Sequence, residues 1–270
     1  YMVGKKVLIL GSGDIGLIMA RRLTLEGAEV KAVVELMPFS GGLTRNIVQC
    51  LDDYNIPLYL SHTVVDIIGK ERLEKIIIAK VDENRRPIPG TEMEYECDTL
   101  LLSVGLIPEN DISRKTGLEI DRRTNGLVVN EMMETSADGI FACGNVVHVH
   151  DLVDFVSAEA RRAGTAAAKY IKNEAKTGEY REITNGKGIV YTVPQKFRAE
   201  NVDKALELFM RVNNIYKNVK LEVKDENKTL VSLKKQHLAP GEMEKIMIPK
   251  KILDTAEGKI LTVEITGGEQ

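Results

Sequence analysis

The sequence predicts an α/β protein that ends in a small antiparallel β-sandwich, and three observations support this. An apolar, branched run at 7–10 leads into a glycine-rich turn and then a helical pattern, which is typical of a buried parallel strand followed by a helix. After residue 185, short β-branched segments alternate with turn signals. The length of 270 residues is enough for two domains or three small ones.

The glycine-rich turn has the spacing of a nucleotide-binding loop, because residues 11–16 read GSGDIG between the strand and the helical pattern. Gly11 permits the tight exit from the strand, Gly13 lets the backbone approach a pyrophosphate, and Gly16 lets helix and strand pack closely. The pyrophosphate then lies at the helix N-terminus, where unpaired N–H groups favour an anion. The expected contact residues are Gly11, Gly13, Asp14, Ile15 and Gly16.

The helix after this turn is predicted over 15–25 and ends at Gly27, a plausible C-cap. Its periodicity places four apolar side chains on one face, which we expect to be the buried face. These side chains are Ile15, Ile18, Met19 and Leu23.

A second strand, predicted over 29–34, is followed by an acidic residue, Glu35. An acid about 20 residues beyond the glycine turn accepts hydrogen bonds from the ribose hydroxyls of an adenosine. It would also repel a 2′-phosphate, and no arginine follows Glu35 directly. We therefore expect a Rossmann-like domain that binds NAD(H) rather than NADP(H).

Composition gives no indication of a nucleic-acid partner, because the net charge is only −3 at pH 7. No apolar run reaches the roughly 18 residues of a membrane-spanning helix. The three cysteines, Cys50, Cys97 and Cys143, form no CxxC pair, which is typical of a reducing compartment. We expect a cytoplasmic protein without a transmembrane segment, in which Cys50 and Cys143 are core residues.

Three regions follow one another along the chain. Residues 1–103 are predicted as the nucleotide-binding domain, with antiparallel segments at 63–68, 73–81 and 93–96 and a returning buried strand from 99. Residues 104–175 are predicted to hold short strands at 127–129 and 139–143 and a helix over 154–173. A charged connector over 174–185 leads to the sandwich, residues 186–270.

Three motifs in this order resemble the two-dinucleotide-binding-domain flavoproteins, the pyridine nucleotide–disulfide oxidoreductase superfamily. Residues 11–35 resemble its NAD(P)H fingerprint, residues 98–108 (DTLLLSVGLIP) the segment that leaves the NAD domain, and residues 135–145 (TSADGIFACGN) the second FAD motif. The resemblance covers residues 1–175. It implies that 104–175 is the second half of an FAD-binding domain.

The resemblance also implies cofactor contacts for individual residues. Asn145 takes the position where family members usually carry the aspartate that binds the ribityl chain of FAD. The backbone after it faces the flavin, and a glycine near residue 105 lies on the nicotinamide side. The residues expected at these positions are Gly105, Gly144, Asn145, Phe155 and Val156.

Family members open with a separate FAD-binding GxGxxG, which this sequence does not contain. We therefore expect a C-terminal fragment that binds FAD weakly or not at all and is inactive alone. Strands over 127–143 would lose their sheet neighbours, and an open edge there would favour a homo-oligomer. The subgroup that the chain resembles is associated with anaerobic glycerol-3-phosphate dehydrogenase, which implies a subunit of that type as partner.

His148 and His150 follow the second FAD motif, and their alternation places both imidazoles on one side of an extended segment. One interpretation is proton transfer at the flavin edge or near the substrate, which makes both histidines candidate catalytic residues. The other is a hydrogen-bonded loop that orients the helix after it. No third ligand follows at a sensible spacing, so no metal site is expected.

The activity implied by the resemblance is hydride transfer from NADH to FAD, followed by reduction of an unidentified acceptor. Two alternatives stay open. One is a disulfide reductase of the same superfamily, which would need a cysteine pair outside this sequence. The other is a non-catalytic NAD(H)-binding or assembly module whose sandwich docks a dehydrogenase partner.

Overall fold

The structure is a computed structural model that describes residues 4–174, 177–226 and 228–268. The chain divides into two compact units, Tyr1–Gly105 (unit 1) and Leu106–Gln270 (unit 2). Each unit has its own hydrophobic core. No helix among the described residues is long and apolar enough to cross a membrane.

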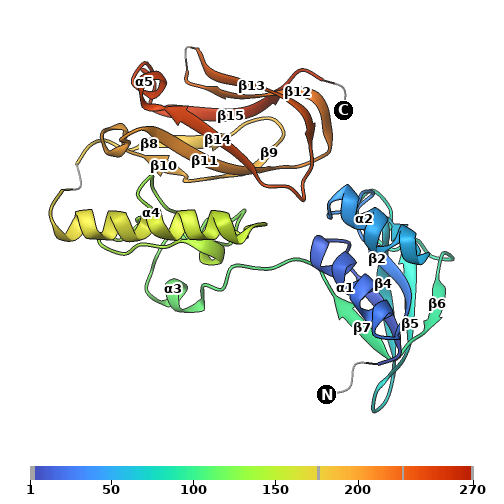
Figure 1. The fold of residues 1–270 in the computed structure, drawn as a ribbon. Coiled ribbons are helices and arrows are strands. Elements are labelled where there is room, and N and C mark those ends of the chain that lie inside the picture. Colours follow the sequence, from blue (N-terminus) through green and yellow to red (C-terminus); the bar gives the residue numbers. More distant parts are fainter. Residues whose placement is uncertain (1–3, 175–176, 227, 269–270) are drawn as a thin grey trace. The chain divides into compact units, whose positions relative to one another are not determined.

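Unit 1 is built on a parallel sheet, as its alternating strands and helices predict. The strand order is β3-β2-β1-β7, and every neighbouring pair is parallel. Two helices cover one face of this sheet, and an antiparallel three-stranded sheet covers the other (Figure 1). The elements are β1 (Lys6–Leu10), α1 (Asp14–Leu25), β2 (Glu29–Glu35), α2 (Thr44–Cys50), β3 (Leu58–Leu60), β4 (His62–Gly69), β5 (Leu73–Lys80), β6 (Met93–Glu96) and β7 (Thr99–Leu102).

The buried face of α1 includes two of the four predicted side chains, because Leu23 is buried and Met19 packs against the core. Leu17, Ala20 and Leu23 are buried, whereas Ile15 is 70% exposed and Ile18 is 46% exposed. The physical reason is the glycine at position 16, whose missing side chain brings that side of the helix against the strands. Residues one, four and seven positions later share this side, so the two isoleucines turn outward.

In unit 2, the helix α3 (Asp111–Lys115) is followed by turns where two strands were predicted. Residues 127–129 and 139–143 form only isolated bridges, Ile120 to Leu127 and Glu134 to Phe141. The Asn130 side chain accepts hydrogen bonds from the backbone N–H groups at 132 and 134 and so curls the chain between them. The predicted strands are therefore wrong, whereas the predicted helix is confirmed as α4 (Val153–Ile171).

The expected open edge at 127–143 is also wrong. The backbone N–H of Val129 donates to Oε1 of Gln195 at 3.0 Å, and the Gln195 backbone N–H donates to the Val129 carbonyl at 3.2 Å. The apolar side chains of this segment share a core with Tyr191 and Val193 of the sandwich. The homo-oligomer stays a prediction, but an open edge at 127–143 no longer supports it.

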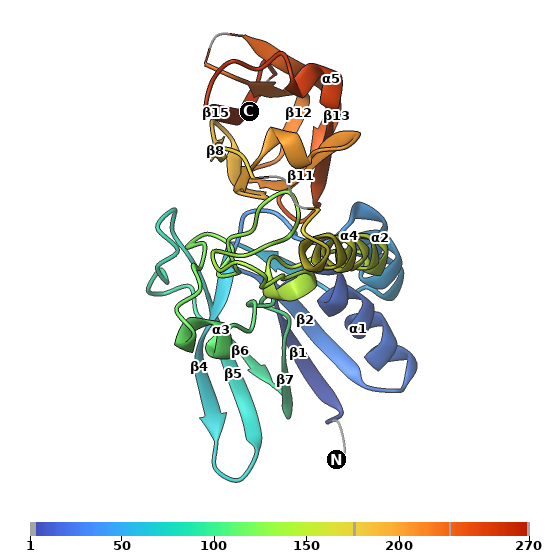
Figure 2. The same cartoon turned by 90° about the vertical axis from the view of Figure 1, so that its left-hand side faces the viewer.

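The sandwich consists of two sheets, in the orders β10-β8-β15-β12-β13 and β14-β11-β9, around one core. All strand pairs are antiparallel except β8 with β15. In both views the sandwich lies along one side of α4 (Figures 1 and 2). Its elements are β8 (Arg181–Asn185), β9 (Ile189–Val193), β10 (Lys196–Phe197), β11 (Ala205–Val212), β12 (Tyr216–Lys224), β13 (Thr229–Leu238), β14 (Glu244–Pro249), α5 (Lys250–Leu253) and β15 (Ile260–Thr266).

The charged connector predicted up to residue 185 ends earlier, because β8 occupies 181–185. This strand has the sequence REITN, in which Ile183 is the single buried residue, so it shows no clear alternation. Ile183 packs in the sandwich core, and β8 pairs with β15 along its length. The strand is therefore defined by its partner rather than by its own alternation.

Candidate functional site

The glycine turn of unit 1 has two positions at which only glycine fits. Gly11 has φ +99°, and a Cβ there would lie 2.0 Å from the carbonyl oxygen of Ser103, just after β7. A Cβ at Gly16 would lie 2.7 Å from the Gly11 carbonyl oxygen and 2.8 Å from the Cβ of Ser103. Because neither glycine has a Cβ, the backbone at the start of α1 can approach the ends of β1 and β7 closely.

Gly13 differs from both, because a Cβ there would meet nothing closer than the Ser103 hydroxyl at 3.9 Å. The backbone at Gly13 therefore borders open space at the N-terminus of α1, which begins at Asp14. The first N–H groups of an α-helix have no partner within the helix. This combination fits a phosphate group.

Glu35, the last residue of β2, is hydrogen-bonded to the glycine turn. Its Oε2 accepts from the backbone N–H of Ser12 at 2.9 Å and from the Ser12 hydroxyl at 2.6 Å. Its Oε1 accepts from the Met37 N–H at 2.9 Å. A carboxylate has about four acceptor sites, so three occupied sites leave about one, on Oε1, for a ligand hydroxyl.

The loop after β2 closes on the same turn through Ser12 and Asp14. The Ser12 hydroxyl accepts from the Gly41 N–H at 3.1 Å, and Oδ1 of Asp14 accepts from the Leu43 N–H at 2.8 Å and from Nδ2 of Asn46 at 2.7 Å. Ser12 is fully buried. Sequence reasoning missed Ser12, although a small hydroxyl residue inside a glycine turn is a usable signal.

The second FAD motif lies in unit 2, and its polar groups are largely used within the protein. The Gly144 N–H donates to Oε2 of Glu159 at 2.5 Å, and the Asn145 side-chain oxygen accepts from the His150 N–H at 3.2 Å. Phe155 packs against Phe209 of β11, with ring centroids 5.4 Å apart. Asn145 itself is exposed at the turn before α4.

His148 and His150 meet at the carboxylate of Glu159, on the second turn of α4. Nε2 of His148 lies 3.0 Å from Oε1, and Nε2 of His150 lies 3.0 Å from Oε2. The two imidazole centroids are 4.2 Å apart, and all three side chains are at most 1% exposed. The hydrogen-bonded loop that orients the helix is thus present, and Glu159 supplies the third group that sequence spacing did not reveal.

Electrostatics in this cluster favour an ionised carboxylate and a neutral imidazole. Burial opposes ionisation of Glu159, but hydrogen bonds from His148 and His150 outweigh it and lower its pKa to about 2. Burial lowers the pKa of His148, although Glu159 opposes this shift. The catalytic assignment of the two histidines stays a prediction.

None of the three cysteines has the lowered pKa that is typical of a reactive thiol. Burial is the largest contribution in each case and raises the pKa of Cys50, Cys97 and Cys143. Cys50 lies in the core of unit 1, as predicted, and is 4% exposed.

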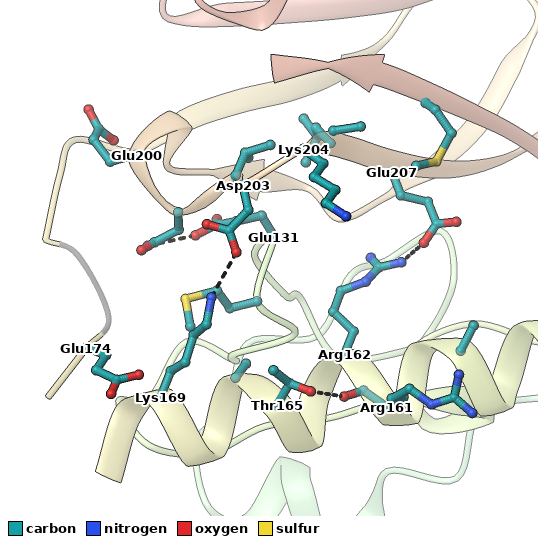
Figure 3. A pocket seen from close by; sticks show the side chains of 18 residues that line it. Glu131, Arg161, Arg162, Thr165, Lys169, Glu174, Glu200, Asp203, Lys204 and Glu207 are labelled. Atoms are coloured by element: carbon teal, nitrogen blue, oxygen red, sulfur yellow. Dashed lines mark hydrogen bonds and ion pairs between the residues drawn. The ribbon is translucent and has the colours of Figure 1, made fainter. Parts of the chain in front are cut away.

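A cavity of about 510 Å³ lies in unit 2 between α4 and the segment 199–207 (Figure 3). Arg162 of α4 pairs with Glu207, and Nζ of Lys169 lies 2.9 Å from Oδ2 of Asp203. These pairs tie α4 to the sandwich. None of the residues predicted to bind NAD(H) or FAD lines this cavity, so it is not their site.

The chain has relatives among known proteins. The chain is 30% identical over 174 residues to an NADH oxidase from Methanocaldococcus jannaschii, which covers 61% of this chain and 35% of the relative. It is 29% identical over 152 residues to a CoA-dependent NAD(P)H sulfur oxidoreductase from Pyrococcus abyssi, covering 54% and 31%. The chain thus spans about a third of the length of these relatives.

Among solved structures, thioredoxin reductase from T. acidophilum superimposes with a TM-score of 0.53 at 24% identity. The match covers 63% of this chain and 53% of the other, and at this identity it shows the fold alone. Residues 2–167 match the family described as pyridine nucleotide-disulphide oxidoreductase. That match includes the glycine turn, Glu35 and the cluster at Glu159, and the chain belongs to this family.

Proposed function

We propose that this chain is the nicotinamide-nucleotide part of an NADH-dependent FAD oxidoreductase. FAD and NAD(P)H are the cofactors of its family. The observation that carries the proposal is the Glu35 carboxylate held 2.9 Å from the Ser12 N–H, beside the open backbone at Gly13. This arrangement fits the adenosine ribose and the pyrophosphate of a dinucleotide.

Each group has a defined task in this proposal. Gly13 and the first N–H groups of α1 bind the pyrophosphate, since no side chain fills that space. Glu35 accepts from a ribose hydroxyl and excludes a 2′-phosphate by charge. Ser12 keeps the carboxylate oriented through its two hydrogen bonds. Gly105, with φ +93° and open space beside it, is the proposed nicotinamide-side position.

For FAD, the proposed positions are Gly144, Asn145, Phe155 and Val156. Exposed Asn145 and the N-terminus of α4 fit the ribityl chain and the ring end of the cofactor. The Gly144 N–H is used by Glu159, which leaves few donors there. FAD supplies the hydride-accepting flavin when bound, and we propose that this chain alone binds it weakly.

Titration with NADH and NADPH tests the proposal. We expect tighter binding of NADH, and a loss of that preference in Glu35→Arg. Equal or tighter binding of NADPH by the unaltered chain would contradict it. A matched control is Glu26→Arg, an exposed charge reversal at the other end of α1, which should leave both affinities unchanged.

The electron acceptor is a separate proposal. The resemblance supports a subunit of the glycerol-3-phosphate dehydrogenase type, in a cytoplasmic enzyme whose cysteines stay reduced. The relatives include an NADH oxidase and a sulfur oxidoreductase, so the family uses more than one acceptor. Adding NADH to the intact flavoprotein that contains this chain and recording flavin absorbance separates an enzyme from a non-catalytic NAD(H)-binding module, because only the former bleaches.

A further inference from the structure

The cluster of His148, His150 and Glu159 has the composition of a metal site. Each residue offers one ligand atom, and these atoms all lie within 4.8 Å of one another. We propose that it binds one divalent transition-metal ion of the zinc type, as a closed structural site that ties the loop at 144–150 to α4. This inference goes beyond the proposed function and does not depend on it.

The distances suit one ion. Each Nε2 lies 3.0 Å from one oxygen of the same carboxylate. For an ion about 2.1 Å from both atoms of such a pair, the N–metal–O angle is about 90°. Zn²⁺ tolerates this angle because its d¹⁰ shell imposes no geometry. Two imidazole nitrogens and one carboxylate oxygen supply three donor atoms, and the second carboxylate oxygen lies 3.0 Å from an imidazole nitrogen as a fourth candidate. Imidazole and carboxylate together suit Zn²⁺ and its neighbours better than Mg²⁺ or Ca²⁺.

Burial and charge support the same assignment. The Glu159 side chain is 1% exposed, and its hydrogen-bond partners are the Gly144 N–H and two imidazoles. A buried charge is costly unless it is paired or binds a metal. A divalent ion would supply the positive charge, and the Gly144 N–H would fix the orientation of the carboxylate.

The surroundings indicate a structural rather than a catalytic site. The ring of Phe209 lies 5.7 Å, centroid to centroid, from each imidazole, and the ring of Tyr191 lies 6.0 Å from His148. The three ligand side chains are at most 1% exposed, whereas catalytic zinc keeps a position open to water or substrate. The ion would hold the Gly144 turn and the second turn of α4 at a fixed separation.

The second ring nitrogen of each histidine limits the expected affinity for the metal ion. Nδ1 of His148 and of His150 are buried, and neither has a hydrogen-bond partner in the described structure. Metal-binding histidines usually donate from this second nitrogen, and loss of such a partner typically costs 10- to 100-fold in affinity. We therefore expect binding that a strong chelator reverses, rather than a site that survives it.

The experiment uses the full chain without a histidine tag, stripped with EDTA and titrated with Zn²⁺ and Co²⁺. The chain has four histidines, so a His62→Asn, His237→Asn double variant removes the other two imidazoles. We expect one ion per chain in the unaltered protein and in this double variant. Bound Co²⁺ should show the visible absorption of nitrogen–oxygen coordination, and saturating Zn²⁺ should raise Tm by roughly 5 °C.

Glu159→Gln and His150→Asn should each lower the affinity at least tenfold, whereas the double control variant should not change it. Because either substitution could prevent folding, ¹⁵N NMR of the unaltered chain provides a second test. Zn²⁺ should shift the Nε2 signals of His148 and His150 and leave those of His62 and His237 in place. No retained ion, an aqueous Co²⁺ spectrum or unshifted Nε2 signals would overturn the proposal and leave a hydrogen-bonded cluster only.

Discussion

Both units hold a glycine turn with a carboxylate from another element, but only one leaves the turn open. In unit 1, Glu35 binds Ser12 between Gly11 and Gly13, and the space beside Gly13 is free. In unit 2, Glu159 binds the N–H of Gly144 and is buried. The same local device therefore borders the open space of the proposed nucleotide site in unit 1, whereas in unit 2 its carboxylate is buried.

The difference arises from what lies over each turn. Unit 1 has a turn at the carboxyl end of a parallel sheet, where α/β proteins leave a crevice. Around the Gly144 turn, β9 and β11 contribute Tyr191 and Phe209, whose rings lie against the histidines. Burial increases the loss of stability caused by a substitution at His148, His150 or Glu159, because no water can replace a lost hydrogen-bond partner.

The largest effect should come from the glycines of unit 1. Gly11→Ala places a Cβ 2.0 Å from the Ser103 carbonyl oxygen at φ +99°, so we expect it to destabilise unit 1 by roughly 3 kcal/mol or more. Gly13→Ala should change stability by less than about 1 kcal/mol, because its space is open. It should still weaken NADH binding roughly tenfold or more.

Calorimetry and NADH titration of both variants measure these effects. The comparison fails if Gly13→Ala unfolds unit 1, or if Gly11→Ala melts at the temperature of the unaltered chain.

The two carboxylates should differ when each is replaced by the isosteric amide. Glu159→Gln removes a charge that two imidazoles and an N–H surround, so we expect a loss of roughly 3 kcal/mol in unit 2. Glu35→Gln should cost about 1 kcal/mol in unit 1, because Glu35 is only half-buried. Urea unfolding of the two variants in parallel measures the difference, and equal losses would contradict the contrast.

Acid should destabilise unit 2 in two stages. The pKa of His148 is lowered by burial, so the unfolded chain binds its proton first and stability falls as pH drops below about 6.5. The pKa of Glu159 is lowered from 4.5 to about 2, so its contribution is present above pH 4.5 and is lost on the way down to about 2. That second stage is on the order of 3 kcal/mol.

Charged and titratable neighbours affect the pH range over which His148 and Glu159 change the stability of unit 2. Arg162 of α4, Tyr191 of β9 and Arg211 of β11 contribute to the electrostatics of the cluster or its neighbours, and Arg211 is paired with Asp151. Thermal unfolding between pH 3 and 8 gives the profile, with Glu159→Gln as the control that should lack the second stage. A stability that rises on acidification would refute the assignment.

The last expected effect is on the nucleotide preference of unit 1. Glu35→Arg should lower NADH affinity and raise NADPH affinity, for a combined change of about 2 kcal/mol, or roughly 30-fold in the ratio. Fluorescence titration of both nucleotides measures it. An unchanged ratio would show that Glu35 is tied to Ser12 without contacting the ribose.

The glycine turn, Glu35 and the helix α4 could be predicted because their signals are local. Gly11 and Gly16 follow a branched strand at fixed spacing, and the strand after α1 runs over Glu29–Glu35, one residue beyond the predicted 29–34. Ile15 and Ile18 were placed on the wrong face, because periodicity gives the spacing of a stripe but not which neighbour it meets. The close contact at Gly16 decided that rotation.

The short strands expected at 127–129 and 139–143 show where local signals were misleading. Their apolar residues are buried, as in a strand, but they pack against Tyr191 and Val193 without joining a sheet. The strand β8 was missed for the opposite reason, because REITN has one buried residue and acquires its pairing from β15. Each case depends on a partner at least 40 residues away.

By itself, the sequence determined the α/β class, the glycine turn and its acid, and the change to a β-sandwich, since strand, helix and turn signals act over a few residues. Tertiary structure alone decided that Glu159 meets His148 and His150, and that Ser12 orients Glu35. These contacts join residues 9 to 23 positions apart. The distances between these side chains depend on how α4 and β2 pack, and residue spacing in the sequence does not predict that packing.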